Sequence, residues 1–444
     1  MHLGKALYPI AEYCTSTART EVIYMYIDTA GPTMGEYRYF TKWVKMKNIF
    51  FLLTLVAFLG SALSGCNEPL WHDQTDAELN KLLASKWASY GSGRTNFGGG
   101  LAMYIISPKG NFYASANMPG GTENTHFRGA STTKSYTGAA IMLLHQQGKL
   151  NIDDLITAGI PGSSEPYIPN TIEYNIPNKG QITIKMLLNH RAGVWDVSNS
   201  NIPSDKAVAY AGQNYVEYIK ALAPEHTFTC EELAGVVATC ELSYFAPDTS
   251  YHYSDTGYSL LGKIIERVSG QRYDQFLQTN LMAPNTLTAT TFPYLGNDRT
   301  IPLPYETGYQ YIAGTLTDVT VDNMSPHVAE GNVITTPAEL AQWIRALIKG
   351  QAGLSAATVA LMTTEATVRN YGLGIFKVTG IGFGHNGAHN GYVTTAFCDP
   401  AQDVTVVMSA SVINWDDLGS EITCLYDTSH AIKNLLGYST LEAN

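Results

Sequence analysis

The chain has 444 residues, of which 45% are hydrophobic, and its formal net charge is -11. This length and apolar content suffice for one large domain or two closely joined domains with a real core. The acidic balance and the lack of a basic stripe argue against a nucleic-acid partner. A solenoid or propeller is disfavoured because the sequence shows no clear internal repeat.

Residues 46–66 have the pattern of a bacterial export signal. Lys47 precedes the apolar run 49–63 (IFFLLTLVAFLGSAL), which is short for a membrane span. The run leads into Leu-Ser-Gly-Cys at 63–66, which resembles a lipobox. We therefore expect a lipid on the sulfur of Cys66 and an exported protein of the cell envelope or periplasm, held at the membrane only by that lipid. The alternatives are an ordinary cleaved signal and an uncleaved anchor.

The position of this signal also bears on the residues before it. Export signals stand at an N-terminus, and this one begins at residue 46. We therefore expect residues 1–45 to be a dispensable extension outside the working protein. Residues 66–75 are expected to be a tether to the folded domain.

Four cysteines remain after the signal, an even number in an oxidising compartment. They allow three pairings. We favour Cys230–Cys240 and Cys398–Cys424 because each pair is close in sequence, and the alternative is four buried free thiols. The absence of Cys-x-x-Cys argues against a zinc knuckle or a thioredoxin-like site.

The predicted elements run from strands to helices and back to strands. The spacing of apolar residues and the turn signals predict a hairpin over 100–117 and a helix over 76–90. Further helices are expected over 131–147, 184–190, 254–269, 273–281, 336–349, 355–363 and 428–436. Strand-like runs cover 371–378, 391–397 and 404–409, whereas 196–250 and 286–330 give no clear element. We expect an α+β hydrolase domain over 76–440, with a sheet part (76–150 and 335–440) and a mostly helical part (151–334). A cleft between the two parts is the natural place for a site.

The stretch 129–134 (GASTTK) places Ser131 and Lys134 one helical turn apart on the same face. Serine is a poor nucleophile without a base beside it, and a buried lysine loses its proton readily because desolvation disfavours the charge. Ser-x-x-Lys at a helix start can therefore supply both nucleophile and base. The alternative is an N-cap serine beside a solvated lysine.

Two later stretches can complete such a site. Tyr253 precedes the helix over 254–269, and a phenolate near a lysine ammonium is a workable base because the cation lowers its pKa. The glycine-flanked run 384–388 (GHNGA) admits a substrate backbone, and His385 can exchange a proton. A second His-Asn-Gly leaves the choice between His385 and His389 open. No metal is expected, because this run lacks His-Glu-x-x-His.

These stretches, taken together, resemble a known family. The runs FRGASTTK (127–134), LLNHRAG (187–193), YSD (253–255), YGLG (371–374) and GHNG (384–387) are similar, in order, to motifs of the penicillin-recognising serine hydrolases. That group includes class C β-lactamases, serine DD-carboxypeptidases and family VIII-type esterases. The resemblance implies an antiparallel sheet flanked by helices, with a mostly helical inserted domain.

The resemblance also implies roles for individual residues. Ser131 would be acylated, Lys134 would help to deprotonate it, and Tyr253 would pass the proton to the leaving group. The backbone N–H groups of Ser131 and Ala388 would form the oxyanion hole, and His385 would support the proton relay. No cofactor is implied.

Departures from the family motifs mark the candidate substrate-binding positions. Asp255 replaces an asparagine; it cannot donate to a substrate carbonyl, but it can pair with Lys134 and raise its pKa. Phe376 stands where DD-carboxypeptidases have a carboxylate-binding arginine. Asn386 and Ala388 replace hydroxyl residues on either side of Gly387.

We expect a serine hydrolase acting through a Ser131 acyl-enzyme on D-amino-acid peptides such as peptidoglycan stem peptide, in the manner of a D-alanyl-D-alanine carboxypeptidase. An esterase for small acyl esters is the next alternative, favoured by Phe376. A β-lactamase follows, because His385 stands where its lysine is expected. An inactive penicillin-binding-like protein is the last alternative.

Overall fold

The computed structural model describes residues 9–12, 22–24, 68–364 and 370–440, in two compact units, Met1–His72 and Asp73–Asn444. In the first unit β1 (Pro9–Glu12) and β2 (Val22–Tyr24) pair antiparallel. The expected lipidation site, Cys66, and the rest of the expected export signal lie outside the described residues. Within the described ranges no helix is both long and apolar enough to span a bilayer.

The tether expected over 66–75 is wrong from Glu68 onward, because helix α2 (Glu68–Gly91) begins there. Three residues spaced four apart, Leu79, Leu83 and Trp87, are buried in the core. This spacing keeps one stripe of the helix against the sheet. The helix extends further toward the N-terminus than the apolar spacing over 76–90 predicted.

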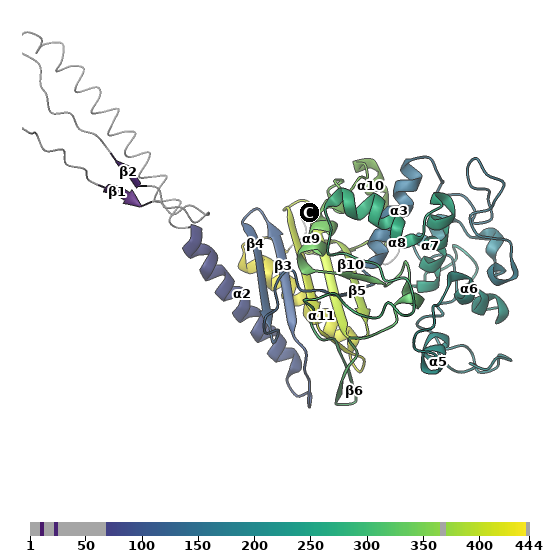
Figure 1. The fold of residues 1–444 in the computed structure, drawn as a ribbon, viewed down its shortest axis with the longest axis horizontal. Coiled ribbons are helices and arrows are strands. Elements are labelled where there is room, and N and C mark those ends of the chain that lie inside the picture. The colour runs from purple at the N-terminus through teal and green to yellow at the C-terminus, as the bar shows by residue number, and fades with distance from the viewer. Residues whose placement is uncertain (1–8, 13–21, 25–67, 365–369, 441–444) are drawn as a thin grey trace, which may run out of the picture. The chain divides into compact units, whose positions relative to one another are not determined.

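The second unit is built on a six-stranded antiparallel sheet with the order β4-β3-β12-β11-β10-β9 (Figure 1). Its strands come from both ends of the unit: β3 (Leu101–Ser107), β4 (Gly110–Ala116), β9 (Phe376–Val378), β10 (Gly382–His389), β11 (Tyr392–Asp399) and β12 (Val404–Ala410). The expectation of an antiparallel sheet flanked by helices is confirmed. Helix α9 (Pro337–Ile348) packs on one face, and α2 and α11 (Leu418–Leu435) pack on the other.

The chain between β4 and β9 supplies the helices beside the sheet in Figure 1. They are α3 (Thr133–Gln146), α4 (Ile184–Leu188), α5 (Tyr215–Leu222), α6 (Cys230–Thr239), α7 (Asp255–Ser269), α8 (Tyr273–Leu277) and α10 (Ala356–Thr364). Single turns occur at η1 (Ile172–Tyr174), η2 (Lys179–Gln181), η3 (Gln278–Met282), η4 (Ala283–Asn285) and η5 (Ser325–His327). The predicted helix over 254–269 matches α7 to within one residue, because Ser254 caps its start and Gly270, with a φ of +69°, ends it.

Short strands also occur where no sequence pattern indicated them. β6 (Tyr309–Ile312), β7 (Thr315–Asp318) and β13 (Val412–Asn414) form a three-stranded sheet. β5 (Phe127–Ala130) pairs with β8 (Val333–Thr335). These strands are three or four residues long, too short for a periodic pattern to be visible.

The predicted disulfides are wrong, because all four cysteines of the described part are free. Cys230 begins α6 and Cys240 caps its end, and ten residues of helix separate two Cα atoms by about 15 Å, beyond the reach of a disulfide. Cys398 lies in the core on the α9 side of the sheet, whereas Cys424 lies on α11, on the opposite side. Closeness in sequence therefore did not bring either pair together.

Candidate active site

Ser131 lies in the turn between β5 and α3, two residues before the helix begins. The preceding Ala130 has a φ of +50°, a backbone conformation that is uncommon for residues other than glycine. Thr133 holds the turn, since its hydroxyl donates to Ala130 O (2.7 Å) and accepts from Val333 N of β8 (2.9 Å). The turn is thus fixed to a neighbouring strand.

Strand β10 runs close beside the Ser131 turn. A Cβ atom on Gly387 would lie 2.3 Å from Gly129 O and 3.0 Å from Ser131 N, so only glycine fits. The next residue, Ala388, pairs with Val393 of β11. The close approach is at Gly387, the residue before Ala388, whose backbone N–H the resemblance implies as a second oxyanion donor. Asn386, on the other side of Gly387, is partly buried.

Lys134 is fully buried in the first turn of α3. Its Nζ donates to Ser131 Oγ (3.1 Å) and to Glu330 O (2.8 Å), and it lies 2.6 Å from Asp255 Oδ1. Burial alone would lower the lysine pKa, but the charges of Asp255 and Glu330 and the hydrogen bond with Asp255 together raise it. Burial likewise opposes ionisation of Asp255, but Lys134 lowers its pKa. The two residues form an ion pair, so Lys134 is an ammonium at neutral pH.

Tyr253 lies just before α7, between Lys134 and His190. The lysine Nζ is 4.7 Å from the centre of its ring, and the His190 ring centre is 4.2 Å away. Burial, together with the negative charge of Asp255, raises the pKa of the phenol well above 10, although its hydrogen bond with Ser131 acts against this. The expectation that the lysine lowers this pKa is wrong, because burial and the Asp255 charge raise it instead. Tyr253 is a proton donor at neutral pH.

The two histidines of β10 have different surroundings. His385 is buried between Asn386 O, 2.5 Å from Nδ1, and the Tyr371 hydroxyl, 2.9 Å from Nε2. Burial lowers its pKa to about 3, so the ring is neutral, donates from Nδ1 and accepts at Nε2. His389 instead bonds Asp322 Oδ2 at 3.0 Å. Of the two histidines, His385 is therefore the one that lies beside Tyr371 and Tyr253.

Phe376 forms part of an aromatic wall beside these groups. Its ring stacks on Tyr371, with the planes 18° apart, and meets His385 edge-on. Tyr251 and Tyr253 also lie near the Tyr371 ring. The apolar ring of Phe376 thus stands at the position where the resemblance to DD-carboxypeptidases implies a carboxylate-binding arginine.

The structure adds residues that the sequence did not single out. Asn199 donates to Asp255 Oδ2 (2.6 Å) and to Asp196 Oδ2 (3.0 Å), so it links two buried carboxyl groups. Burial and the nearby Asp255 raise the pKa of Asp196 to about 8. Glu330 approaches Lys134 from the segment before β8. No local motif marks these positions, because each reaches the site through long-range packing.

Among the residues described, no three His, Cys, Asp or Glu side chains are grouped as metal ligands.

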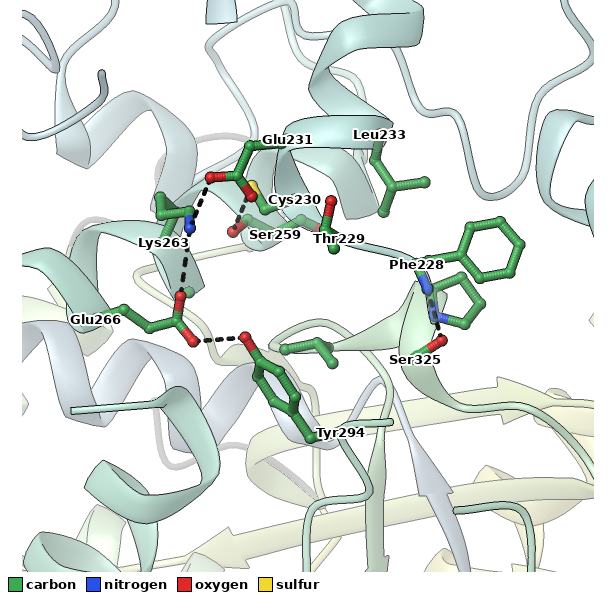
Figure 2. Close-up of a pocket in the computed structure, with 13 residues that line it drawn as sticks. Phe228, Thr229, Cys230, Glu231, Leu233, Ser259, Lys263, Glu266, Tyr294 and Ser325 are labelled. Carbon is green, nitrogen blue, oxygen red and sulfur yellow. Dashed lines mark hydrogen bonds and ion pairs between the residues drawn. The ribbon is translucent and has the colours of Figure 1, made fainter. Parts of the chain in front are cut away.

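A small cavity of about 80 Å³ lies beside α6 and α7, and Ser131 does not line it. Figure 2 shows dashed lines that join Lys263 to Glu231 and to Glu266, and Glu266 to Tyr294. Lys263 lies 3.0 Å from Glu231 and 3.6 Å from Glu266, which accepts from the Tyr294 hydroxyl at 2.8 Å. These contacts tie α6 to α7, whose first residue is Asp255. The side chains that line the cavity therefore help to hold α7, and with it Asp255, in place.

Comparison with known proteins agrees with this geometry. Residues 96–418 match the Beta-lactamase family model. "Protein flp" of Staphylococcus aureus (strain MW2) is 29% identical over 168 residues, which are 38% of this chain and 28% of that protein. The chain thus matches less than a third of that relative's length.

Solved structures share the fold more completely. A D-stereospecific amidohydrolase from Streptomyces sp. has a TM-score of 0.64 at 21% identity, covering 80% of this chain and 98% of its own. D-amino acid amidase from Ochrobactrum anthropi SV3, complexed with L-phenylalanine amide, has a TM-score of 0.64 at 19% identity, covering 82% and 98%. The matched family model covers more than half of the chain, and the chain belongs to the Beta-lactamase family.

Proposed function

We propose that this enzyme hydrolyses amide bonds of D-amino acid amides and short D-amino acid peptides, peptidoglycan stem peptide included, through an acyl-enzyme on Ser131. The observation that carries the proposal is the contact between Lys134 Nζ and Ser131 Oγ, 3.1 Å, beside the Tyr253 phenol. The substrate class is supported by two structural relatives whose names describe a D-stereospecific amidohydrolase and a D-amino acid amidase.

In this mechanism Lys134 first loses its ammonium proton to solvent, and the resulting amine takes the Ser131 hydroxyl proton while Ser131 Oγ attacks the substrate carbonyl carbon. The backbone N–H groups of Ser131 and Ala388 stabilise the oxyanion, a contribution of about 10²–10³ in rate per donor. Tyr253 gives its phenol proton to the leaving nitrogen and is reprotonated from Lys134. Water then attacks the acyl-enzyme, releases the acid and restores the Ser131 hydroxyl.

The aromatic wall favours a neutral group over a free carboxylate at the leaving end of the substrate. Phe376, stacked on Tyr371, offers no positive charge there. Lys134 already has Asp255 as its counter-ion. A terminal amide or a longer peptide fits these surroundings better than the carboxylate of a strict D-alanyl-D-alanine carboxypeptidase substrate.

The test compares D- and L-phenylalanine amide and a D-alanyl-D-alanine peptide as substrates, with ammonia or amino-acid release as the readout. We expect hydrolysis of the D-amide, little of the L-amide, and none by Ser131→Ala. Equal rates for both enantiomers would reject the stereochemical assignment. Benzylpenicillin, followed by intact mass, shows in parallel whether the enzyme forms a lasting adduct or turns the drug over.

An esterase is the second candidate, and Phe376 is the residue that favours it. An apolar ring suits a short acyl ester, and an ester leaving group needs less help from an acid. Hydrolysis of p-nitrophenyl butyrate at a far higher kcat/KM than any D-amide would select this alternative.

We further propose that the protein is exported and lipid-anchored through Cys66. The support is the sequence alone, in which an apolar run leads into Leu-Ser-Gly-Cys. Metabolic labelling with a fatty acid should mark the wild type and leave Cys66→Ala unlabelled. Unlabelled wild type would reject the anchor.

A further inference from the structure

The two oxyanion donors of the proposed mechanism lie in different sheets. Among the described strands, Ser131 follows β5, which pairs with β8, whereas Ala388 lies in β10 of the six-stranded sheet. Ladder hydrogen bonds fix each strand within its own sheet. The distance between the two N–H groups therefore depends on the contacts that join β5 to β10.

The hairpin of β10 and β11 sets the direction of the Ala388 N–H. A two-residue turn connects His389 to Tyr392, so these residues close the hairpin as a hydrogen-bonded pair. Ala388, one residue earlier, then belongs to a non-hydrogen-bonded pair, and its N–H points away from β11. His389 lies on the same face of β10 as Gly387, which is the face that contacts the nucleophile turn.

Asp322 joins the tip of this hairpin to neighbouring segments. Its Oδ2 accepts from His389 Nε2 (3.0 Å) and from Asn390 Nδ2 (3.5 Å). Its Oδ1 lies 2.7 Å from Lys220 Nζ of α5 and accepts from Asn323 N (2.7 Å). Because Asp322 pairs with an ammonium it is a carboxylate, so His389 Nε2 is the donor in their hydrogen bond.

The main chain of the same segment is fixed to β5. Arg128, three residues before Ser131, is fully buried, and its Nη2 donates to Thr320 O (3.1 Å) and to Asp322 O (3.5 Å). Asp322 thus holds β10 through its side chain and β5 through its main chain.

We propose that Asp322 is a positioning residue that holds the Ala388 N–H at the distance from the Ser131 N–H that an oxyanion requires. Gly387 limits how closely β10 approaches the nucleophile turn, and Asp322 prevents the strand from moving away. Asp322 acts through His389 and Arg128 and not on the reacting atoms. The inference rests on the proposed acyl-enzyme mechanism and adds what keeps its two donors aligned.

The test measures labelling of Ser131 by a fluorophosphonate on the full chain, followed by intact mass. It gives a maximal rate constant and a half-saturation concentration, and it requires no knowledge of the natural substrate. We expect Asp322→Ala to lower the rate constant about 10²-fold, as for a lost oxyanion donor, and to leave the half-saturation concentration within about twofold. An arylboronic acid, which adds to Ser131 as a tetrahedral anion, should bind about 10²-fold more weakly.

Two variants of His389 separate the hydrogen bond from packing. His389→Leu fills a similar volume but cannot donate to Asp322, so it should reproduce both losses. It also covers the case that Asp322→Ala, which removes the partner of Lys220, does not fold. His389→Gln places an amide N–H near the position of Nε2 and should recover at least about tenfold of each loss.

Asp399→Ala is the matched control, because it also removes a buried carboxylate from a lysine. Asp399 lies 2.8 Å from Lys433 and its side chain is 16% exposed, against 9% for Asp322. It ends β11, about 23 Å along the strand from Tyr392, the partner of His389. We expect wild-type labelling and boronate affinity in this variant, with a loss of stability in urea comparable to that of Asp322→Ala.

Wild-type labelling and boronate affinity in both Asp322→Ala and His389→Leu would overturn the proposal. Equal losses in His389→Leu and His389→Gln, or a matching loss in Asp399→Ala, would also overturn it, because they indicate a general loss of stability. Labelling of the wild type without hydrolysis of any D-amide would refute only the proposed substrate class and leave this test intact.

Discussion

The Lys134 ammonium and the Asp255 carboxylate are 2.6 Å apart, with side chains that are 0% and 8% exposed. A buried pair of this kind is held together by the cost of leaving either charge alone. Where the motif of the resembling enzymes has a neutral amide, this chain has a counter-ion. The pair keeps Lys134 protonated. Lys134 can act as a base only after it loses that proton, and the surrounding residues set the pKa at which it does so.

Asp255→Asn should release Lys134 from its counter-ion. Burial then dominates and lowers the pKa of Lys134, so the amine form becomes available at lower pH. We expect the acid limb of the pH profile for Ser131 labelling by a fluorophosphonate, followed by intact mass, to move to lower pH. Loss of one buried partner should also lower the free energy of unfolding by about 3 kcal/mol, measured in urea.

The control for this stability change is Asp248→Asn, which breaks an ion pair of Arg191 with a largely exposed carboxylate. It should cost less than about 1 kcal/mol. The acid limb for Asp255→Asn must move to lower pH. A move to higher pH would contradict the ion-pair interpretation.

Tyr253→Phe should separate leaving groups by their need for a proton. The phenol, with its pKa raised by burial and by Asp255, is a donor at neutral pH. Its loss should reduce kcat/KM about 10²–10⁴-fold for an amide, because the amine must leave protonated. A p-nitrophenyl ester, whose leaving group is stable as an anion, should lose far less. Equal losses for both substrates would argue that Tyr253 acts on Ser131 and not on the leaving group.

Gly387→Ala tests the close approach of β10 to the nucleophile turn. The added Cβ would meet Gly129 O at 2.3 Å, so either the strand or the turn must move. We expect a loss of about 10² in kcat, as for a lost oxyanion donor, and about 1–3 kcal/mol of stability. Gly419→Ala in α11, where a Cβ meets nothing within 4 Å, should instead stabilise by about 0.5–1 kcal/mol. Full activity in Gly387→Ala would rule out Ala388 N–H as an oxyanion donor placed by this contact.

Asp196→Asn should change how stability depends on pH. An unfolded aspartic acid ionises near pH 4, whereas burial and Asp255 hold the pKa of Asp196 at about 8 in the folded chain. Between these values the folded state binds the extra proton, so Asp196 contributes stability at low pH that is lost as the pH rises toward 8. The loss is about 1.4 kcal/mol per pH unit for one group.

Urea unfolding at several pH values between 4 and 8 measures this slope. The slope should be smaller in Asp196→Asn than in the wild type. Asp153→Asn, at a side chain that is 69% exposed, should retain the wild-type slope. Identical slopes in all three proteins would show that Asp196 is ionised in the folded state.

Several features could be predicted because they depend on residues near one another in the sequence. The apolar spacing after Ser254 gave α7 to within one residue, and its cap and terminal glycine are local signals. Ser131 and Lys134 lie three residues apart, so a single helical turn nearly suffices to bring them together. The order of the motifs led to the family and to the antiparallel sheet, both of which are confirmed.

Other predictions failed where closeness in sequence and closeness in space differ. Cys230 and Cys240 lie at opposite ends of one helix, which holds them apart. The pKa of Tyr253 is raised by burial and by a third residue, Asp255, neither of which the spacing of Tyr253 and Lys134 in the sequence reveals. The phenolate prediction considered only the pair.

By itself, therefore, the sequence determined helices with clear local signals, such as α7, together with the nucleophile motif and the family, because caps, apolar spacing and short motifs act over a few residues. It gave no signal for α5 and α6, and α11 begins ten residues before the helix expected over 428–436. Only the tertiary structure decided which groups surround Lys134. Glu330 and Asp255 reach it from segments more than a hundred residues away, and their burial with the lysine sets which of them carry a charge. Burial and electrostatic coupling belong to the packed core, and no local pattern in the chain records them.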